Sequence, residues 1–318
     1  MTDILDAYAH VALPRFLSGE EMLRVMDAHR VAKTLICTAP TCPDVIELSK
    51  SIRNHPDRFL AAGLPMGRDK KEILEGVEAQ LDSGFVGLRV MEDSLMEHPE
   101  ILESLGRHGS ALFLIGGGGF VRSATSLLGF LGDFPGSAIF APHFAGGGEP
   151  SILKLIPVVS KLFSHPRFFV IFSLHGAFDP IQLKPWAQAL VAQLGWDRIL
   201  FGSEFPVPLY RNESFASTMT WADRAGIALG LKERLAFLHG NAERLLFNRR
   251  PNTSMLNSKW QMTNLKESSA VKLFPEKPME LSEEANRKVL EAYLAKDPSA
   301  NSSYRDFVQR SPLPRGEG

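Results

Sequence analysis

The sequence has very little cysteine, and this scarcity limits the class of protein. Cys37 and Cys42 are its only cysteines, and they are not spaced as a C-x-x-C pair. Two such thiols argue against a disulfide framework and against a structural zinc knuckle. We therefore set aside disulfide-rich secreted domains and expect the protein to work in a reducing cytoplasm.

An excess of charge of either sign is also lacking. The chain carries 35 basic and 36 acidic residues, which gives a formal net charge of -1. This balance offers no electrostatic basis for binding nucleic acid or an anionic membrane. No apolar run reaches the roughly 20 residues that span a bilayer. The start of the chain, with Asp3 and Asp6, lacks the basic-then-apolar layout of a signal peptide. We expect neither nucleic acid nor a membrane as a partner.

Two catalytic motifs are incomplete. The four glycines at 116–119 lack the Lys-Ser/Thr ending of a phosphate-binding loop and the spacing of a dinucleotide-binding fingerprint. We interpret them as a turn that leads into a helix. Ser173 lacks the Gly-x-Ser-x-Gly elbow of a serine hydrolase, which favours a packing or hydrogen-bonding role for its hydroxyl.

Strand-like and helix-like segments alternate along most of the chain. The hydrophobic content of 44% in 318 residues is typical of a globular protein with one large domain, or a domain and a tail. Apolar runs predict strands at 4–10, 33–38, 59–65, 85–91, 111–115, 137–143, 168–174 and 198–204. Helical spacing predicts helices at 20–30, 44–54, 70–83, 100–107, 122–131, 151–163, 181–194, 212–224 and 232–247.

Eight such units in about 250 residues predict a (β/α)8 TIM-like barrel over residues 1–247. Near-continuous apolar strands indicate a parallel sheet that is covered by helices. An open doubly wound sheet is the competing architecture, but it does not explain why polar residues end strands one, four, six and eight. In a barrel those strand ends meet at one mouth, where such enzymes place their chemistry.

Residues 248–318 differ from the rest of the chain in composition and pattern, and they are predicted to form a C-terminal extension. The segment is polar and irregular, with one helix predicted at 282–295 and a loose end. An apolar stripe on that helix, which includes Val289 and Tyr293, predicts packing on the barrel or across a homodimer.

The candidate site residues stand at the ends of the predicted strands. Glu204 ends the eighth strand just before Pro206, which cannot extend a ladder. A carboxylate at the end of a buried strand requires a partner or a chemical role. His10 ends the first strand and His143 ends the sixth, and each is either a hydrogen-bonded core histidine or a catalytic one. Arg89 is predicted to point inward, toward a substrate carboxylate or toward an acid of the barrel wall.

Several motifs resemble the amidohydrolase-related family, in the branch of aminocarboxymuconate-semialdehyde decarboxylase-like enzymes and lactonases. The resemblance covers about residues 4–247. It depends on the segments DAYAH at 6–10, MDAHRV at 26–31, HPDRF at 55–59, GFVGLR at 84–89, APHFAGG at 141–147, DRILFGSEFP at 197–206 and GNAERLLF at 240–247. The stretch that ends at Pro206 is the most specific of these segments.

The sequence departs from the family at its metal-ligand positions. The family has His-x-His on strand one, a His near the end of strand five and an Asp at the end of strand eight. Here those positions hold Tyr8, Ile115 and Glu204, while His10 is kept. Since Tyr is a poor zinc ligand at neutral pH, we expect no bound cofactor. The alternative is one divalent metal such as zinc, held by His10, His143 and Glu204.

The resemblance implies an enzyme that acts on a small molecule, and we predict a metal-independent or metal-degenerate hydrolase of a small carboxylated lactone, ester or amide. Glu204 is the predicted general base, with His10 as its neighbour and His143 stabilising the oxyanion. Arg89, Tyr8 and His175 are the predicted substrate-binding residues. Non-oxidative decarboxylation or hydration, and a non-catalytic ligand-binding barrel, are the alternatives.

Overall fold

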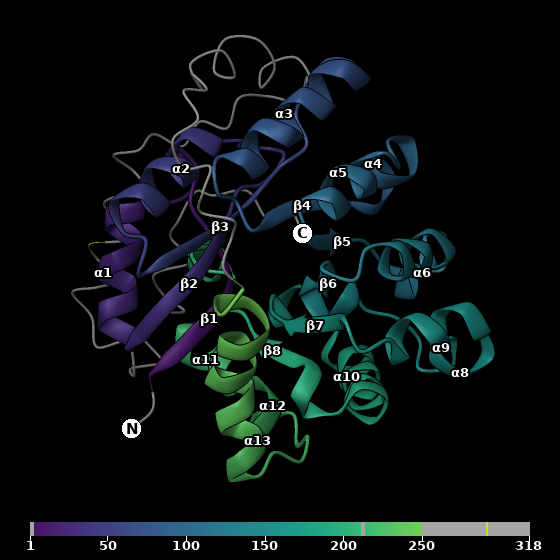
Figure 1. The fold of residues 1–318 in the computed structure, drawn as a ribbon. Coiled ribbons are helices and arrows are strands. Elements are labelled where there is room, and N and C mark those ends of the chain that lie inside the picture. The colour runs from purple at the N-terminus through teal and green to yellow at the C-terminus, as the bar shows by residue number, and fades with distance from the viewer. Residues whose placement is uncertain (1–2, 211–213, 250–290, 292–318) are drawn as a thin grey trace.

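Eight parallel strands form one sheet in strand order β1 to β8 (Figure 1). The structure is a computed structural model that describes residues 3–210, 214–249 and 291. The strands are β1 (Ile4–His10), β2 (Val31–Cys37), β3 (Phe59–Gly63), β4 (Gly87–Met91), β5 (Ala111–Ile115), β6 (Ala138–Ala141), β7 (Phe168–Phe172) and β8 (Ile199–Phe201). Backbone hydrogen bonds from Glu204 to Tyr8 and from His10 to Phe205 join the two edges. The predicted (β/α)8 barrel is confirmed.

Helices follow the strands and form an outer layer around the barrel (Figure 1). The longer ones are α1 (Gly19–His29), α2 (Val45–Asn54), α3 (Lys70–Asp82), α5 (Ile101–Arg107), α6 (Ala124–Asp133), α9 (Pro157–Ser164) and α10 (Pro180–Leu194). The shorter ones are α4 (Glu92–Glu97), α7 (Pro142–Ala145), α8 (Ile152–Leu155), α11 (Phe215–Met219), α12 (Trp221–Arg224) and α13 (Leu231–Leu235). Single turns are η1 (Gly118–Phe120), η2 (His175–Ala177), η3 (Trp196–Arg198), η4 (Val207–Tyr210), η5 (Ala236–Gly240) and η6 (Glu243–Phe247).

Side-chain alternation along the strands separates two apolar cores. On β5, Leu112 and Leu114 face the helices, whereas Phe113 faces the barrel interior. Inside the barrel the Phe113 and Phe140 rings stack with centroids 5.1 Å apart, and Phe169 lies 5.1 Å beyond Phe140. These rings fill the interior, so that open space is left only toward the mouth.

Several element boundaries differ from the prediction, with a local cause in each case. The strand predicted at 198–204 is only Ile199–Phe201, and Glu204 stands in the loop beyond it with a left-handed φ of 59°. The helix predicted at 151–163 is divided into α8 and α9, because Pro157 begins the second helix and cannot continue the first. The short α4 was not predicted.

The predicted extension at 248–318 lies outside the described residues, except for positions 248, 249 and 291. Glu291 accepts hydrogen bonds of 2.5 and 3.0 Å from the two terminal nitrogens of Arg24 on α1. In the described ranges, none of the helices combines the length and the apolar character that are needed to cross a bilayer.

Candidate active site

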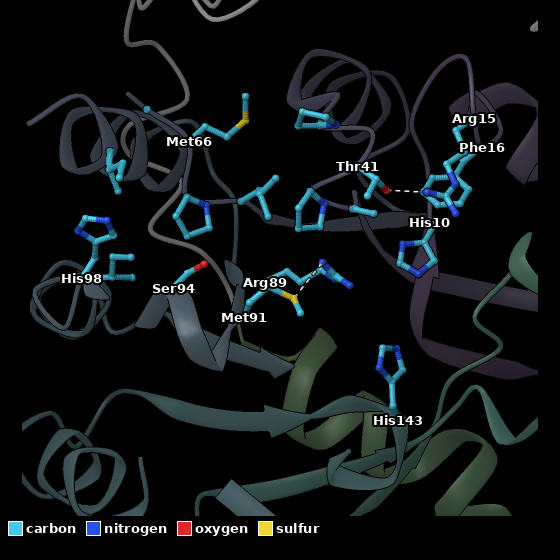
Figure 2. Close-up of a pocket in the computed structure, with 18 of the residues that line it drawn as sticks. His10, Arg15, Phe16, Thr41, Met66, Arg89, Met91, Ser94, His98 and His143 are labelled. Carbon is cyan, nitrogen blue, oxygen red and sulfur yellow. Dashed lines mark hydrogen bonds between the residues drawn. The ribbon is translucent and has the colours of Figure 1, made fainter. Parts of the chain in front are cut away.

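A cavity of about 370 Å³ opens at the carboxyl ends of the strands (Figure 2). Its lining includes His10 from β1, Arg89 from β4, His143 from the turn after β6, and Glu204 from the loop after β8. The barrel brings these four side chains together although they are spread over nearly 200 residues of the sequence. The convergence predicted from the strand ends is present in the structure.

The Glu204 carboxylate is the centre of this group. Its Oε1 atom lies 2.8 Å from His10 Nε2 and 3.0 Å from His143 Nε2, and the carboxylate is 3% exposed. A carboxylate oxygen accepts hydrogen bonds and cannot donate when ionised. Both histidines therefore donate from Nε2, which leaves the Nδ1 lone pair on each ring when that ring is neutral. The other oxygen, Oε2, is buried and accepts no hydrogen bond from the described residues.

The backbone at two of these residues is strained. Glu204 has a φ of 59° and His143 a φ of 54°, and both values lie in the left-handed region that residues other than glycine rarely adopt. Such a conformation costs about 1 kcal/mol or more, and it persists only where surrounding contacts enforce it. Strain of this kind collects at functional sites, so it supports a chemical role for both residues.

Hydrogen bonds from β1 and from the loop after β7 hold this strained backbone. Glu204 N donates to Tyr8 O at 2.9 Å, and His143 N donates to Ser173 Oγ at 3.2 Å. Ser173 thus has the hydrogen-bonding role expected from its sequence context.

Asp6 is a supporting residue that the sequence did not reveal. Its carboxylate accepts hydrogen bonds from Ser203 Oγ at 2.5 Å, Ser203 N at 2.9 Å and Tyr8 N at 3.1 Å. Burial raises the pKa of Asp6 to about 7, although the hydrogen bonds from Ser203 oppose this rise. The carboxylate links β1 to residues 203 and 204 after β8. The sequence signal for this role was an acidic residue within an apolar strand, two residues before Tyr8.

Cys37 is a second supporting residue. Its Sγ lies 3.4 Å from His10 Nδ1, on the side of the ring opposite Glu204. Phe16 stacks on the same imidazole with centroids 4.9 Å apart. The thiol, the carboxylate and the aromatic ring fix the position of His10 in the manner of residues that orient catalytic groups.

The charges of His10 and Glu204 stabilise each other. Burial by itself lowers the pKa of His10, but Cys37 and Glu204 outweigh burial and raise that pKa to about 9. Burial by itself raises the pKa of Glu204, but the charges and hydrogen bonds of His143 and His10 outweigh it and hold the pKa far below its ordinary value. At neutral pH, Glu204 is a carboxylate and His10 is an imidazolium.

Arg89 presents a buried positive charge to the cavity. Its Nε donates to Tyr8 Oη at 2.7 Å, and its Nη1 lies 3.9 Å from Met91 Sδ. The side chain is buried, and among the residues that the structure describes no carboxylate forms an ion pair with it. The alternative expected from the sequence, a salt bridge to an acid of the barrel wall, is therefore not what the described residues show.

Tyr8 lies beneath the site instead of lining the cavity. Its ring is fully buried and makes edge contacts with His10 and His143, at centroid distances of 5.3 and 5.5 Å. Burial raises the pKa of Tyr8 well above its ordinary value, so the phenol keeps its proton. The residue supports Arg89 and both imidazoles from below.

His175 is not brought into the cavity. It lies on η2, outside the lining, and its ring faces Trp221 with centroids 6.1 Å apart. Burial, with a smaller contribution from Arg224, lowers its pKa to about 3, so the imidazole is neutral. The grouping of His175 with the substrate-binding residues followed from its place after a strand, but η2 turns it away from the mouth.

The donor atoms do not fit a tightly held divalent metal. At the position of the first histidine of the family motif, the protonated Tyr8 phenol already accepts a hydrogen bond from a guanidinium. Ile115 offers no donor atom, and both histidine Nε2 atoms are directed at Glu204 Oε1. Catalytic zinc sites hold three ligands around one open position. Over the described ranges, no group of three or more His, Cys, Asp or Glu side chains is arranged to hold a metal ion.

Three solved structures share this fold. A dihydroxybenzoic acid decarboxylase from Polaromonas sp. JS666, with bound manganese and the inhibitor 2-nitroresorcinol, has a TM-score of 0.59 and 16% identity over 79% of this chain and 98% of that one. An amidohydrolase from Burkholderia multivorans with bound zinc has a TM-score of 0.59 and 13% identity over 77% and 99%. A probable 2-pyrone-4,6-dicarboxylic acid hydrolase from Acinetobacter baumannii, with citric acid bound, has a TM-score of 0.57 and 14% identity over 77% and 99%.

These likenesses show the fold, and the sequence itself identifies the family. A comparison with curated proteins found no match. A family model described as amidohydrolase matches residues 6–247, which is the whole barrel. The chain therefore belongs to the amidohydrolase family, and it is an enzyme of that family.

Proposed function

We propose that this enzyme hydrolyses a small carboxylated lactone, ester or amide without a bound metal. The observation that carries the proposal is the contact of Glu204 Oε1 with both His10 and His143, beside a buried arginine in one cavity. It provides a proton acceptor, a fixed positive charge and an anion-binding group within the same space.

The charges at this end of the cavity favour an anionic substrate. At neutral pH, His10 and Arg89 each contribute a positive charge and Glu204 contributes a negative one. A carboxylate that binds Arg89 neutralises part of this positive charge, and a guanidinium binds such a group through two parallel hydrogen bonds. This supports Arg89 as the residue that holds the substrate carboxylate.

The proton from the attacking water passes to the Glu204–His143 pair in this proposal. From the sequence we expect Glu204 itself to act as the base, but a carboxylate whose pKa is far below the working pH accepts protons poorly. In its neutral form His143 donates from Nε2 to Glu204, and the Nδ1 lone pair of this cavity-lining residue is then the proton acceptor. Glu204 then stabilises the imidazolium that forms, as the acid of a catalytic triad does.

The hydrolytic step balances with these groups alone. Water oxygen bonds to the carbonyl carbon, and its proton moves to His143 Nδ1. The positive charges of His10 and Arg89 lower the energy of the oxyanion that develops on the carbonyl oxygen. The bond from the carbonyl carbon to the leaving oxygen or nitrogen breaks, and His143 returns the proton to that atom.

Non-oxidative decarboxylation is the second candidate. His10 keeps its proton at neutral pH, so it can protonate the carbanion that remains after carbon dioxide leaves the substrate. One structural neighbour is a dihydroxybenzoic acid decarboxylase. In this alternative, Arg89 orients the departing carboxylate.

Activity assays with paired variants test the proposal. Carboxylated lactones and esters are screened by acid release, and evolved carbon dioxide is measured in parallel. Glu204→Gln and His143→Asn should each lower kcat about 100-fold or more, because each removes one member of the base. The matched controls Glu103→Gln, at an exposed position of α5, and His175→Asn on η2 should stay within twofold of wild type. Full activity of Glu204→Gln would contradict the proposal, and carbon dioxide without acid release would favour the second candidate.

A further inference from the structure

The cavity has two chemically different ends. Its charged end includes His10, Arg15, Arg89, His143 and Glu204. In Figure 2, His98, Ser94 and Met66 lie on one side of Arg89, and His10 and His143 lie on the other. We call the apolar part of the lining the apolar lobe, which consists of Leu64, Pro65, Met66, Ile73, Met91 and Ile101.

The apolar lobe is built from three neighbouring β/α units. Leu64 and Met66 follow β3, Ile73 lies on α3, and Ile101 lies on α5. Leu64 and Met66 are each only 4% exposed, and yet they border the cavity. Buried apolar side chains around a cavity gain free energy when an apolar group fills it.

The rim beyond the lobe is polar and carries an acid. Ser94 and Glu97 on α4, and His98 at its end, line the cavity there. Glu97 is exposed, but its carboxylate disfavours a second negative charge in the ligand at this end because like charges repel. One negative charge therefore belongs at Arg89 and none at the rim.

We propose that the substrate is a monocarboxylate with an apolar arm of about four or more carbon atoms, which lies in the apolar lobe. The carboxylate binds Arg89, the scissile carbonyl lies beside Glu204 and His143, and the arm extends past Met66. This inference rests on the proposed function, because it places the reacting carbonyl at the same base.

Binding of inert carboxylates to the full-length protein tests this inference without turnover. The probes for calorimetric titration are acetate, butanoate, hexanoate, octanoate and octanedioate. The affinity should rise twofold to fourfold for each methylene from butanoate to octanoate, since a fully buried methylene contributes about fourfold. Octanedioate should bind at least fivefold more weakly than octanoate because of Glu97.

A matched pair of variants locates the arm. Met66→Gln keeps the length of the side chain and makes the lobe polar, and Met96→Gln makes the same change at an exposed position of α4. Met66→Gln should weaken octanoate binding at least fivefold and acetate binding less than twofold, whereas Met96→Gln should change neither. The chain-length series in the wild type remains decisive if Met66→Gln does not fold.

Three outcomes would overturn the inference: an affinity independent of chain length, tighter binding of octanedioate than of octanoate, or the same effect from both methionine variants. If the protein hydrolyses short esters but its affinity for carboxylates does not depend on chain length, the inference is refuted and the proposed function is kept. Clear chain-length dependence without any hydrolysis would refute the proposed function and keep the binding lobe.

Discussion

Glu204, His10 and His143 share one carboxylate oxygen, so the protonation of each depends on the others. The attraction between the His10 imidazolium and the Glu204 carboxylate contributes to both the raised pKa of His10 and the lowered pKa of Glu204, together with Cys37 in the first case and His143 in the second. Separating such a pair is costly, since either partner alone is a buried charge. The pair therefore contributes to folding stability as well as to chemistry.

The charge of His10 should appear in the pH dependence of stability. Its pKa in the folded protein, about 9, lies above the ordinary value of 6.5. The folded state therefore binds this proton more tightly, and the contribution is fully present below pH 6.5 and is lost as the pH rises through about 9. We expect the free energy of unfolding, measured by denaturant titration, to fall across this interval.

His10→Asn is the control for this pH dependence, and it should flatten the fall between pH 6.5 and 9. Cys37→Ala should reduce the fall, because Cys37 is the largest of the influences that raise this pKa. An equally steep fall in His10→Asn would assign the pH dependence to another group.

At the scale of elements, the two glycine runs are packing features. The loop after β5 and the turn after β6 touch at Gly116 and Gly146. A Cβ atom added to Gly146 would lie 1.6 Å from Gly116 O, and the φ of Gly146 is 76°. Only a residue without a side chain fits there. The run at 116–119 was predicted as a turn, and the sequence did not indicate that it contacts the turn after β6.

Gly146→Ala should therefore destabilise the protein by about 3 kcal/mol or more, since the methyl group meets backbone that cannot rotate away. Gly118→Ala is the matched control. Gly118 also has a positive φ, of 58°, but no atom lies within 4 Å of its added Cβ. That variant should lose only about 1 kcal/mol, from backbone strain alone. Equal losses in a denaturant titration would show that the contact between the loops is unimportant.

The sequence predicted strands better than strand ends, and the site depends on those ends. Alternation correctly placed Arg89 inward, because β4 is regular. Glu204 was predicted at a strand tip, but it stands beyond Phe201 in a left-handed conformation that no propensity encodes. The partnership of Arg89 with Tyr8 joins β4 and β1, and such a distant pair is not visible in a single sequence. The apolar lobe depends on the paths of the loops after β3 and β4, and these paths could not be predicted from the sequence either.

For the whole molecule, the alternation of strand-like and helix-like segments predicted the barrel, and the sequence motifs predicted the family. The predicted stripe of the extension at 248–318 lies outside the described residues, and so a homodimer remains a prediction. Beyond residue 249, the structure describes the Arg24–Glu291 pair as a contact of this segment with the barrel. Both side chains are about half exposed, and surface ion pairs contribute only about 0–1 kcal/mol.

Truncation after Phe247 should lower the melting temperature or change the mass in solution, because it removes the apolar stripe with the ion pair. Arg24→Ala removes the ion pair alone and should leave both quantities nearly unchanged. Scanning calorimetry and light scattering measure the two quantities. If the truncated protein matches the full-length protein in both, the extension does not pack on the barrel or on a second copy.

The central proposal for this enzyme is that hydrolysis proceeds without a metal. Elemental analysis of the purified enzyme, combined with activity before and after chelation, tests this claim most directly. We predict far less than one zinc or manganese per chain, activity that survives chelation, and no gain of metal in Glu204→Asp, because Tyr8 and Ile115 still occupy the other ligand positions. One tightly bound transition metal per chain, with activity lost on its removal and restored on its return, would contradict the claim.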